Sequence, residues 1–458
     1  MTSVDFGAAA ETAGQWVNAL LEGASALGAN VRPGTEVNIF GIPLEFILFA
    51  FTLIGVAVFH HRTFTVAATG LIVITLFKLL YTGFPAGIGV EGLGAHLWED
   101  RITLSNLFLL LLGFAVLSRQ FEDSKAPDAM PALLPDNWTG GVALLAMIFC
   151  LSAFLDNIAA ALVGGVIARH VYGGKVHIGY LAGIVAASNA GGSGSVLGDT
   201  TTTMMWIAGV NPLHVLHAFI AAAVAFVVFA LPIAIVQQRY HPIQKHRAAG
   251  LVIDWGRVGV VIFILCCAVA ANFGANMFAP HLIHTVPVIG LAVWAAILIS
   301  APVRMPDFKV VPANLKGTLF LLALVTCASM MPVEKLPEAS WHTALGLGFV
   351  SSVFDNIPLT ALAIDQGGYD WGVLAFAVGF GGSMVWFGSS AGVALSNMYP
   401  DAKSVGAWIR HGWWVAIGYV AGFFVLLTVL GWNPREVPAK VVAPHAADLS
   451  APAEAGGL

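Results

Sequence analysis

An aspartate–asparagine pair occurs twice in apolar surroundings, at Asp156-Asn157 in FLDNIAAAL and at Asp355-Asn356 in VFDNIPLTA. An ionised carboxylate at membrane depth is costly unless an opposite charge or a proton neutralises it. No Lys or Arg occurs in the apolar segments 140–168 and 341–366 that contain the pairs. Each pair therefore indicates a site that holds a cation when the carboxylate is ionised and a proton when the cation leaves.

A glycine-rich stretch follows each pair, SNAGGSGSVLGDTTTT at 188–203 and GFGGSMVWFGSS at 379–390. Glycine costs roughly 1 kcal/mol relative to alanine inside a helix, so both stretches predict a helix that is broken. Unwound backbone carbonyls, together with hydroxyl and carboxylate oxygens, are ligands for hard cations. The candidate ligands in these stretches are Asn189, Ser193, Asp199, Thr200, Ser383 and Ser389. Asp156, Asp355 and Asp199 are the candidate carboxylate ligands of Na⁺.

Each candidate also has a purely structural interpretation. Asp156, Asp355 and Asp199 could cap the N-termini of the helices that follow them, because aspartate is a favoured N-cap residue. The candidate asparagines could instead satisfy loop backbone groups. At this point both interpretations stay open for all six residues.

The composition identifies the kind of protein that must position these residues. The chain has 458 residues, 58% of them hydrophobic and 10% charged, against about 25% charged in a soluble domain. A net charge of −5 gives no basis for a nucleic-acid partner. No CxxC or HExxH spacing occurs, so we expect neither a resident cofactor nor an enzyme. The four cysteines lie in apolar stretches and are predicted to be buried without disulfides. These features predict an all-α polytopic membrane protein whose main partner is the lipid bilayer.

Apolar segments of about 20 residues, the length that spans a bilayer as a helix, follow one another along the chain. They lie near 38–58, 64–84, 103–118, 140–168, 176–209, 213–236, 257–278, 284–302, 317–331, 341–366, 371–399 and 405–431. Segments 140–168 and 341–366 are interrupted at the Asp-Asn pairs, which predicts two re-entrant hairpins with polar tips. Such tips must be packed in protein or line a wet cavity.

The order of hairpin and broken helix recurs, which predicts two repeats. The predicted domains are an extracytoplasmic tail (1–37), a first transmembrane repeat (38–236), a cytoplasmic linker (237–256), a second repeat (257–431) and a disordered tail (432–458). With the N-terminus outside, fourteen of the 20 basic residues fall on the cytoplasmic side and five outside. This is the positive-inside bias, and it makes the second repeat inverted relative to the first. Inverted repeats with broken helices are typical of secondary transporters.

The strings LSAFLDNIAAAL, ASNAGGSGSVLGDTTTTMMWI and SSVFDNIPLTAL resemble the ion transporter superfamily that includes NhaD-type sodium/proton antiporters and arsenite permeases. They look closest to a branch labelled putative citrate transporters, and the resemblance covers roughly residues 40–431. It implies a scaffold domain and a mobile transport domain, often in a homodimer of the bacterial inner membrane. It also implies Na⁺ and H⁺ as the transported ions.

Two departures from the family pattern bear on the substrate. Aligned on the shared Gly-Gly-Ser, Ser389 stands opposite Asp199, so the two ion sites are not identical. Carboxylate transporters of the superfamily typically carry Ser-Asn-Thr at the hairpin tips, whereas both tips here carry Asp-Asn. The sequence therefore favours a sodium (or lithium)/proton antiporter. The alternatives are a cation-coupled citrate or dicarboxylate transporter and a non-transporting membrane scaffold.

Four other polar residues lie in apolar segments. Glu45 and Lys78 could form a buried pair, or Lys78 could extend to the membrane interface. His214 and His217 share one helix face and could relay protons or be interfacial residues without a transport role. The sequence does not decide between these roles.

Overall fold

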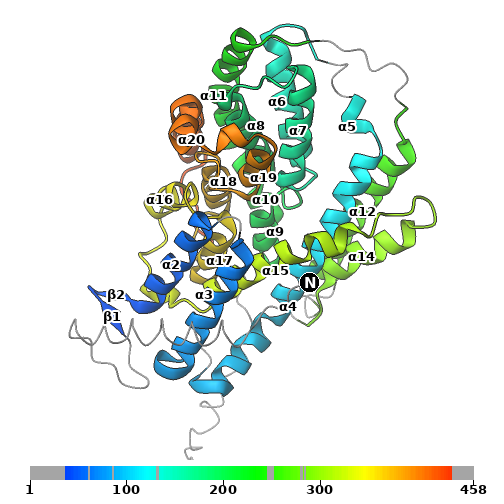
Figure 1. The fold of residues 1–458 in the computed structure, drawn as a ribbon. Coiled ribbons are helices and arrows are strands. Elements are labelled where there is room, and N and C mark those ends of the chain that lie inside the picture. Colours follow the sequence, from blue (N-terminus) through cyan, green and yellow to red (C-terminus); the bar gives the residue numbers. More distant parts are fainter. Residues whose placement is uncertain are drawn as a thin grey trace, which may run out of the picture.

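The computed structural model describes residues 37–59, 62–84, 87–129, 134–244, 252–278, 282 and 285–435. These residues are mostly helical (Figure 1). Two short antiparallel strands of two residues each, β1 (Asn38–Ile39) and β2 (Ile42–Pro43), form a hairpin before helix Leu44–Val58. All of the predicted N-terminal tail except Val37 lies outside the described residues.

Five described helical segments are long and apolar enough to cross a membrane. They are Thr63–Thr82, Gly89–Asp123, Pro212–Tyr240, Val310–Ser329 and Val405–Leu430. Shorter apolar helices lie between them, so the chain is a polytopic membrane protein.

One set of helices, here called the scaffold group, packs around two long helices, Gly89–Asp123 and Val310–Ser329. It consists of α2 (Leu44–Val58), α3 (Thr63–Phe77) with the π-helical turn η2 (Lys78–Thr82), α4 (Gly89–Asp123), α12 (Trp255–Phe278), α14 (Val288–Ser300) and α15 (Val310–Ser329). Helix α4 packs on α14, α15 packs on α3, and α4 and α15 contact each other. The scaffold group therefore combines helices from both halves of the chain.

The second set, here called the bundle group, has its own apolar core. Its first-half helices are α6 (Trp138–Ser152), α7 (Asn157–Val171), α8 (Ile178–Ser193), α9 (Thr200–Ile207), α10 (Pro212–Val215) and α11 (Ala218–Tyr240). Its second-half helices are α16 (Trp341–Ser351), α17 (Asn356–Gln366), α18 (Trp371–Gly381), α19 (Ser390–Met398) and α20 (Val405–Leu430). The short elements α5 (Ala126–Ala129), η4 (Val333–Lys335) and η5 (Pro400–Lys403) complete the described chain. Helices α11 and α20 pack together at the centre of this core. Figure 1 shows α9, α15 and α17 where the two groups meet.

All four predicted interruptions are present. The hairpins break at 153–156 and 352–355, and the glycine-rich segments break at 194–199 and 382–389. Each glycine-rich break lies against a hairpin turn. A Cβ on Gly198 would be 1.8 Å from the carbonyl oxygen of Ser152, and a Cβ on Gly388 would be 2.4 Å from that of Ser352. Only glycine allows the two backbones to approach this closely.

Two expectations need correction. Cys327 is buried as predicted, but Cys150 and Cys266 are exposed on the protein surface. Apolar segments of a membrane protein face lipid as well as protein, so an apolar neighbourhood does not imply burial. Residues 432–435, predicted to begin a disordered tail, are held by ordered contacts. Asn433 N–H donates to Asp370 (3.0 Å) and Trp371 Nε1 donates to the carbonyl of Arg435 (2.8 Å). Residues 436–458 lie outside the described residues.

Helix bounds also differ around the linker. Helix α11 extends to Tyr240, inside the predicted linker 237–256, and α12 begins at Trp255. Residues 245–251 of the linker lie outside the described residues.

The isolated polar residues of the first spans are buried. Glu45 is 5% exposed and Lys78 4% exposed, so Lys78 does not extend to the interface. The Lys78 ammonium lies 5.7 Å from the centre of the Phe84 ring, and Glu45 and Glu334 are the carboxylates that interact with it electrostatically. Both Glu45 and Lys78 are thus buried, and a direct pair between them stays a prediction.

Candidate functional site

The four helix breaks meet where the scaffold group faces the bundle group. Helix α7 packs against α19, and α17 packs against α9. The second helix of each hairpin therefore contacts the second part of the broken helix from the other half of the chain. This crossed packing brings residues separated by about two hundred positions into one site.

Asn189 is the centre of a hydrogen-bonded network between the two halves. Asn157 Nδ2 donates to Asn189 Oδ1 (3.1 Å) and to Asp199 Oδ1 (3.3 Å). Asn189 Nδ2 in turn donates to the hydroxyls of Ser383 (2.9 Å) and Ser389 (3.2 Å). All five side chains are buried, which strengthens the hydrogen bonds between them.

A second set of bonds links the carboxylates to hydroxyls. The Thr201 hydroxyl donates to Asp199 Oδ2 (2.7 Å) and accepts from Asn356 Nδ2 (2.9 Å). The Ser390 hydroxyl donates to Asp355 Oδ2 (2.9 Å). Sequence analysis did not select Thr201 or Ser390 as site residues. The available signals were the TTTT run and the position of Ser390 in the aligned Gly-Ser-Ser.

The capping interpretation holds for two of the three aspartates. Asp355 Oδ1 accepts from Ile357 N–H (3.2 Å), and Asp199 Oδ1 accepts weakly from Thr201 N–H (3.4 Å). Asp156 occupies the N-cap position of α7 and completes no geometrically ideal capping hydrogen bond, but the backbone N–H groups of Asn157, Ile158 and Ala159 interact with its carboxylate. Capping therefore accounts for part of the environment of Asp156, and the residue also lines the cavity described next.

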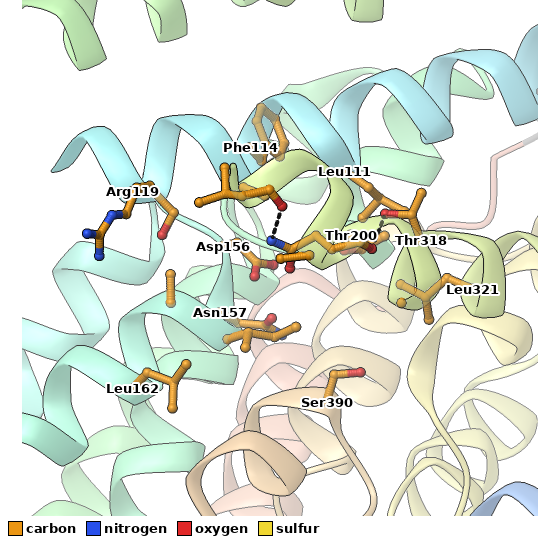
Figure 2. Close-up of a pocket in the computed structure, with 18 of the residues that line it drawn as sticks. Leu111, Phe114, Arg119, Asp156, Asn157, Leu162, Thr200, Thr318, Leu321 and Ser390 are labelled. Carbon is orange, nitrogen blue, oxygen red and sulfur yellow. Dashed lines mark hydrogen bonds between the residues drawn. The ribbon is translucent and has the colours of Figure 1, made fainter. Parts of the chain in front are cut away.

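A cavity of about 620 Å³ separates the two groups at this point (Figure 2). On the bundle side its wall contains Asp156, Asn157, Asp199, Thr200, Asn356 and Ser390. On the scaffold side α4 and α15 contribute Ser118, Asn314 and Thr318 beside apolar residues such as Phe114. Figure 2 shows Asp156 and Asn157 between α4 and the start of α19.

Three carboxylates lie near one another at this cavity. Asp156 and Asp199 are close enough for their negative charges to interact, as are Asp199 and Asp355. Asp355 lies behind Ser390 and does not itself line the cavity. The basic residues in the described lining are Arg119 and Lys309, which come from the outer parts of α4 and the turn before α15. The carboxylate, amide and hydroxyl oxygens of the bundle wall are suited to a hard cation.

Charged residues surround the outer end of the cavity. Arg119 pairs with Glu122 and Asp123, both at 3.3 Å, and lies 3.9 Å from Asp307. Beyond them Arg304 donates to Asp254 (2.8 Å). This bond holds the pKa of the exposed Asp254 carboxyl below its usual range and raises the pKa of the Arg304 guanidinium. These ion pairs connect α4, the start of α12 and the turn before α15, so they hold this end of the scaffold group together.

Not every candidate joins the site. The Ser193 hydroxyl donates to the carbonyl of Ala190 in its own helix (2.9 Å). Outside the site, His214 and His217 have ring centres 6.3 Å apart at α10, so their proposed relay stays a prediction.

Comparison with known proteins gives relatives of one kind. No protein family model matches the chain. It is 26% identical over 383 residues to the Na⁺/H⁺ antiporter NhaD of Vibrio parahaemolyticus, covering 71% of this chain and 90% of that protein. It is 25% identical over 389 residues to the Na⁺/H⁺ antiporter NhaD of Halomonas elongata, covering 72% and 77%. It is 28% identical over 333 residues to sodium/proton antiporter 1 of Arabidopsis thaliana; 64% of this chain matches 56% of that longer protein.

The chain is a distant homologue of NhaD-type sodium/proton antiporters. This confirms the resemblance seen in the hairpin and broken-helix motifs. The NhaD-type relatives are transporters and not enzymes, as expected. All three are named for sodium and protons, and none for a carboxylate.

Proposed function

We propose that the protein exchanges Na⁺ or Li⁺ for protons across a membrane, and that Asp156 and Asp199 carry the exchanged ions. The observation that carries the proposal is the pair of carboxylates in the bundle wall of one cavity, while the basic residues of the described lining, Arg119 and Lys309, belong to the scaffold wall. A bound Na⁺ neutralises the pair in one state, and protons neutralise it in the other. Distant homology to NhaD-type antiporters supports the same reaction.

The surrounding residues have distinct proposed roles. Asn157 and Thr201 donate to Asp199 and fix its orientation. Asp156 completes no capping hydrogen bond of ideal geometry, and we propose that it changes its ligands during the cycle. Asn189, Ser383 and Ser389 connect this site to the second half of the chain. Asp355 accepts from Ser390 and forms a second acidic position, which does not itself line the cavity although Ser390 does. In the second half, Ser389 stands opposite Asp199 of the first half. We therefore propose that the acidic positions of the two halves are not equivalent.

We also propose that the halves 38–236 and 257–431 are inverted repeats. Corresponding helices make corresponding contacts: α6 packs on α8 as α16 packs on α18. The crossed contacts of α7 with α19 and of α17 with α9 fit the same relation. In this proposal the bundle group is the mobile transport domain, and the cavity opens toward the cytoplasmic face of a bacterial inner membrane, where Arg119 and Lys309 lie.

Cysteine labelling tests this orientation. Gln244 and Glu338 are both exposed and lie in predicted cytoplasmic and periplasmic loops. In intact cells, an impermeant thiol reagent should label Glu338→Cys and not Gln244→Cys. The background must lack the native cysteines, because Cys150 and Cys266 are exposed. Labelling of Gln244→Cys but not of Glu338→Cys would show that the proposed orientation is inverted.

Competition between Na⁺ and H⁺ gives a pH prediction. If the same carboxylate oxygens hold both ions, lowering the pH adds protons and weakens Na⁺ binding. Linkage allows up to about a tenfold loss of apparent Na⁺ affinity per pH unit for each competing proton. Apparent affinity should be measured at several pH values in proteoliposomes. A constant Na⁺ affinity across the acid and alkaline range would contradict shared carboxylates.

Reconstitution decides between the transport classes. Purified protein in liposomes containing a pH-sensitive dye should move protons when Na⁺ or Li⁺ is added outside, and K⁺ should serve as the control cation. Uptake of labelled citrate without a Na⁺-driven pH change would instead identify a carboxylate transporter. The absence of any ion-dependent signal would favour a non-transporting scaffold.

A further inference from the structure

A second, smaller pocket lies on the bundle group, away from the proposed transport site. It has a volume of about 140 Å³ and lies between the start of α8, the last turns of α11 and the start of α20. Its polar wall consists of His177, Arg410 and His411, and its aromatic wall of Trp413 and Trp414. Neither wall takes part in the ion site proposed above.

The His177 ring is fixed as a hydrogen-bond donor. Its Nδ1 accepts from Gly179 N–H (3.1 Å), so the neutral ring carries its proton on Nε2. The backbone N–H of His177 donates to Gln237 of α11 (2.7 Å), which holds the residue in place. The His411 ring stands edge-on to it with ring centres 4.9 Å apart. Two imidazoles therefore line one small space.

Arg410 adds a permanent positive charge. Its side chain is exposed, and it makes no hydrogen bond or ion pair with another residue in the described part of the chain. A guanidinium presents a planar fork of donors that matches the oxygens of a phosphate group. Arg410 and the two histidines thus form an anion site without an acidic residue in the described lining.

The aromatic residues indicate where this pocket lies relative to the bilayer. Trp413 is 47% exposed and stacks on Trp414 with ring centres 4.1 Å apart, while Tyr240 at the end of α11 is 58% exposed. Tryptophan and tyrosine are enriched at the level of lipid headgroups. The pocket also lies where three helices begin or end, which is the expected depth of the interface.

We propose that this pocket binds the phosphate of an anionic phospholipid in the leaflet at this face. Water occupies roughly 30 Å³ in the liquid, so about 140 Å³ holds four or five water-sized groups, enough for a phosphate. Arg410, His177 and His411 contact the phosphate oxygens, and Trp413 and Trp414 pack against the glycerol and the first acyl carbons. Basic pockets between transmembrane helices are known to suit anionic headgroups.

Thermal unfolding of the purified full-length chain tests the lipid site independently of transport. In nanodiscs of phosphatidylcholine, replacing part of the lipid by dioleoylphosphatidylglycerol should raise the Tm in a saturable way, because a ligand that binds the folded state stabilises it. Arg410→Gln should remove most of this rise. Arg169→Gln is the matched control, since Arg169 is exposed near the same end of the bundle group, in the last turn of α7, but does not line the pocket.

Three results would overturn the proposal. One is the absence of a rise in the wild-type chain. Another is an equal loss in Arg410→Gln and Arg169→Gln, which would show a general effect of surface charge. The third is an equal rise on adding inorganic phosphate alone to phosphatidylcholine nanodiscs, which would identify a soluble anion as the ligand.

Discussion

Asp156→Asn should abolish Na⁺/H⁺ exchange while leaving the fold intact. The amide keeps the size of the carboxylate and caps helices about as well, so the contacts of residue 156 with the first N–H groups of α7 should be retained. The substitution removes the negative charge that a cation requires and the group that a proton titrates. A hydrogen bond to a charged group contributes roughly 1.5–3 kcal/mol. A cation ligand of that strength, when lost, should weaken Na⁺ binding about 10- to 150-fold at 1.4 kcal/mol per tenfold.

The measurement is exchange in proteoliposomes together with a direct Na⁺-binding assay and a melting curve. Asp401→Asn is the matched control, because Asp401 is an exposed carboxylate in η5, away from the cavity. It should behave as wild type. Near-normal exchange by Asp156→Asn with an unchanged Tm would exclude Asp156 as an ion-carrying group, although the fold would be unaffected by that result.

The same series separates the three aspartates. Asp199→Asn removes the charge that faces Asp156 and changes the bond with Thr201, so it should also lower exchange strongly. Asp355→Asn changes an acid that lies behind Ser390 and caps α17, a role that asparagine can retain. Equal losses at Asp156 and Asp355 would support two equivalent ion sites, whereas a smaller loss at Asp355 would support the inequivalence proposed here.

Local chemistry explains which parts of this site could be predicted from sequence. The breaks at 153–156 and 352–355 follow from polar residues in apolar segments, and those at 194–199 and 382–389 follow from glycine density. These are properties of neighbouring residues, so they can be read along the chain. They also placed Asp156, Asn157 and Asp199 at breaks that the structure brings to one cavity.

The contacts between halves could not be predicted in the same way. Thr201 meets Asn356, and Asn189 meets Ser383, only because α17 packs on α9 and the breaks face each other. No periodicity in the sequence encodes such pairings. The scaffold wall was missed for a similar reason, since Asn314 and Thr318 are single polar residues in α15.

Helix α4 shows a further limit of hydropathy. The predicted segment was 103–118, whereas the helix runs from Gly89 to Asp123. Its early turns contain His96 and Asp100, which lower the local hydropathy but are buried. His96 Nε2 lies 3.1 Å from the Ser329 hydroxyl and 3.6 Å from Asp100 Oδ2. Burial of these polar side chains depends on partners in α15, and a hydropathy window does not include such partners.

Gly198→Ala should prevent the chain from folding normally. The new methyl group would lie 1.8 Å from the carbonyl oxygen of Ser152, a backbone atom that cannot rotate away. Relief requires the glycine-rich break to move away from the hairpin turn, which would also separate Asp199 from Asn157. Overpacking typically costs about 1–3 kcal/mol and occasionally more. Because the clash here is with a backbone atom, we expect a cost at the upper end of this range, with less folded protein and a lower Tm.

A matched glycine distinguishes this clash from a general effect of alanine. Gly346 lies inside α16 with open space around the position of its missing Cβ. Gly346→Ala should therefore be neutral or stabilise the chain by up to about 1 kcal/mol, through helix propensity. Yield, Tm and exchange should be measured for both variants. A Cβ on Gly388 would lie 2.4 Å from the carbonyl oxygen of Ser352, so Gly388→Ala should resemble Gly198→Ala. Wild-type stability of Gly198→Ala would mean that the break and the hairpin turn are not in contact, and the shared site of Asp156 and Asp199 would then lose its structural basis.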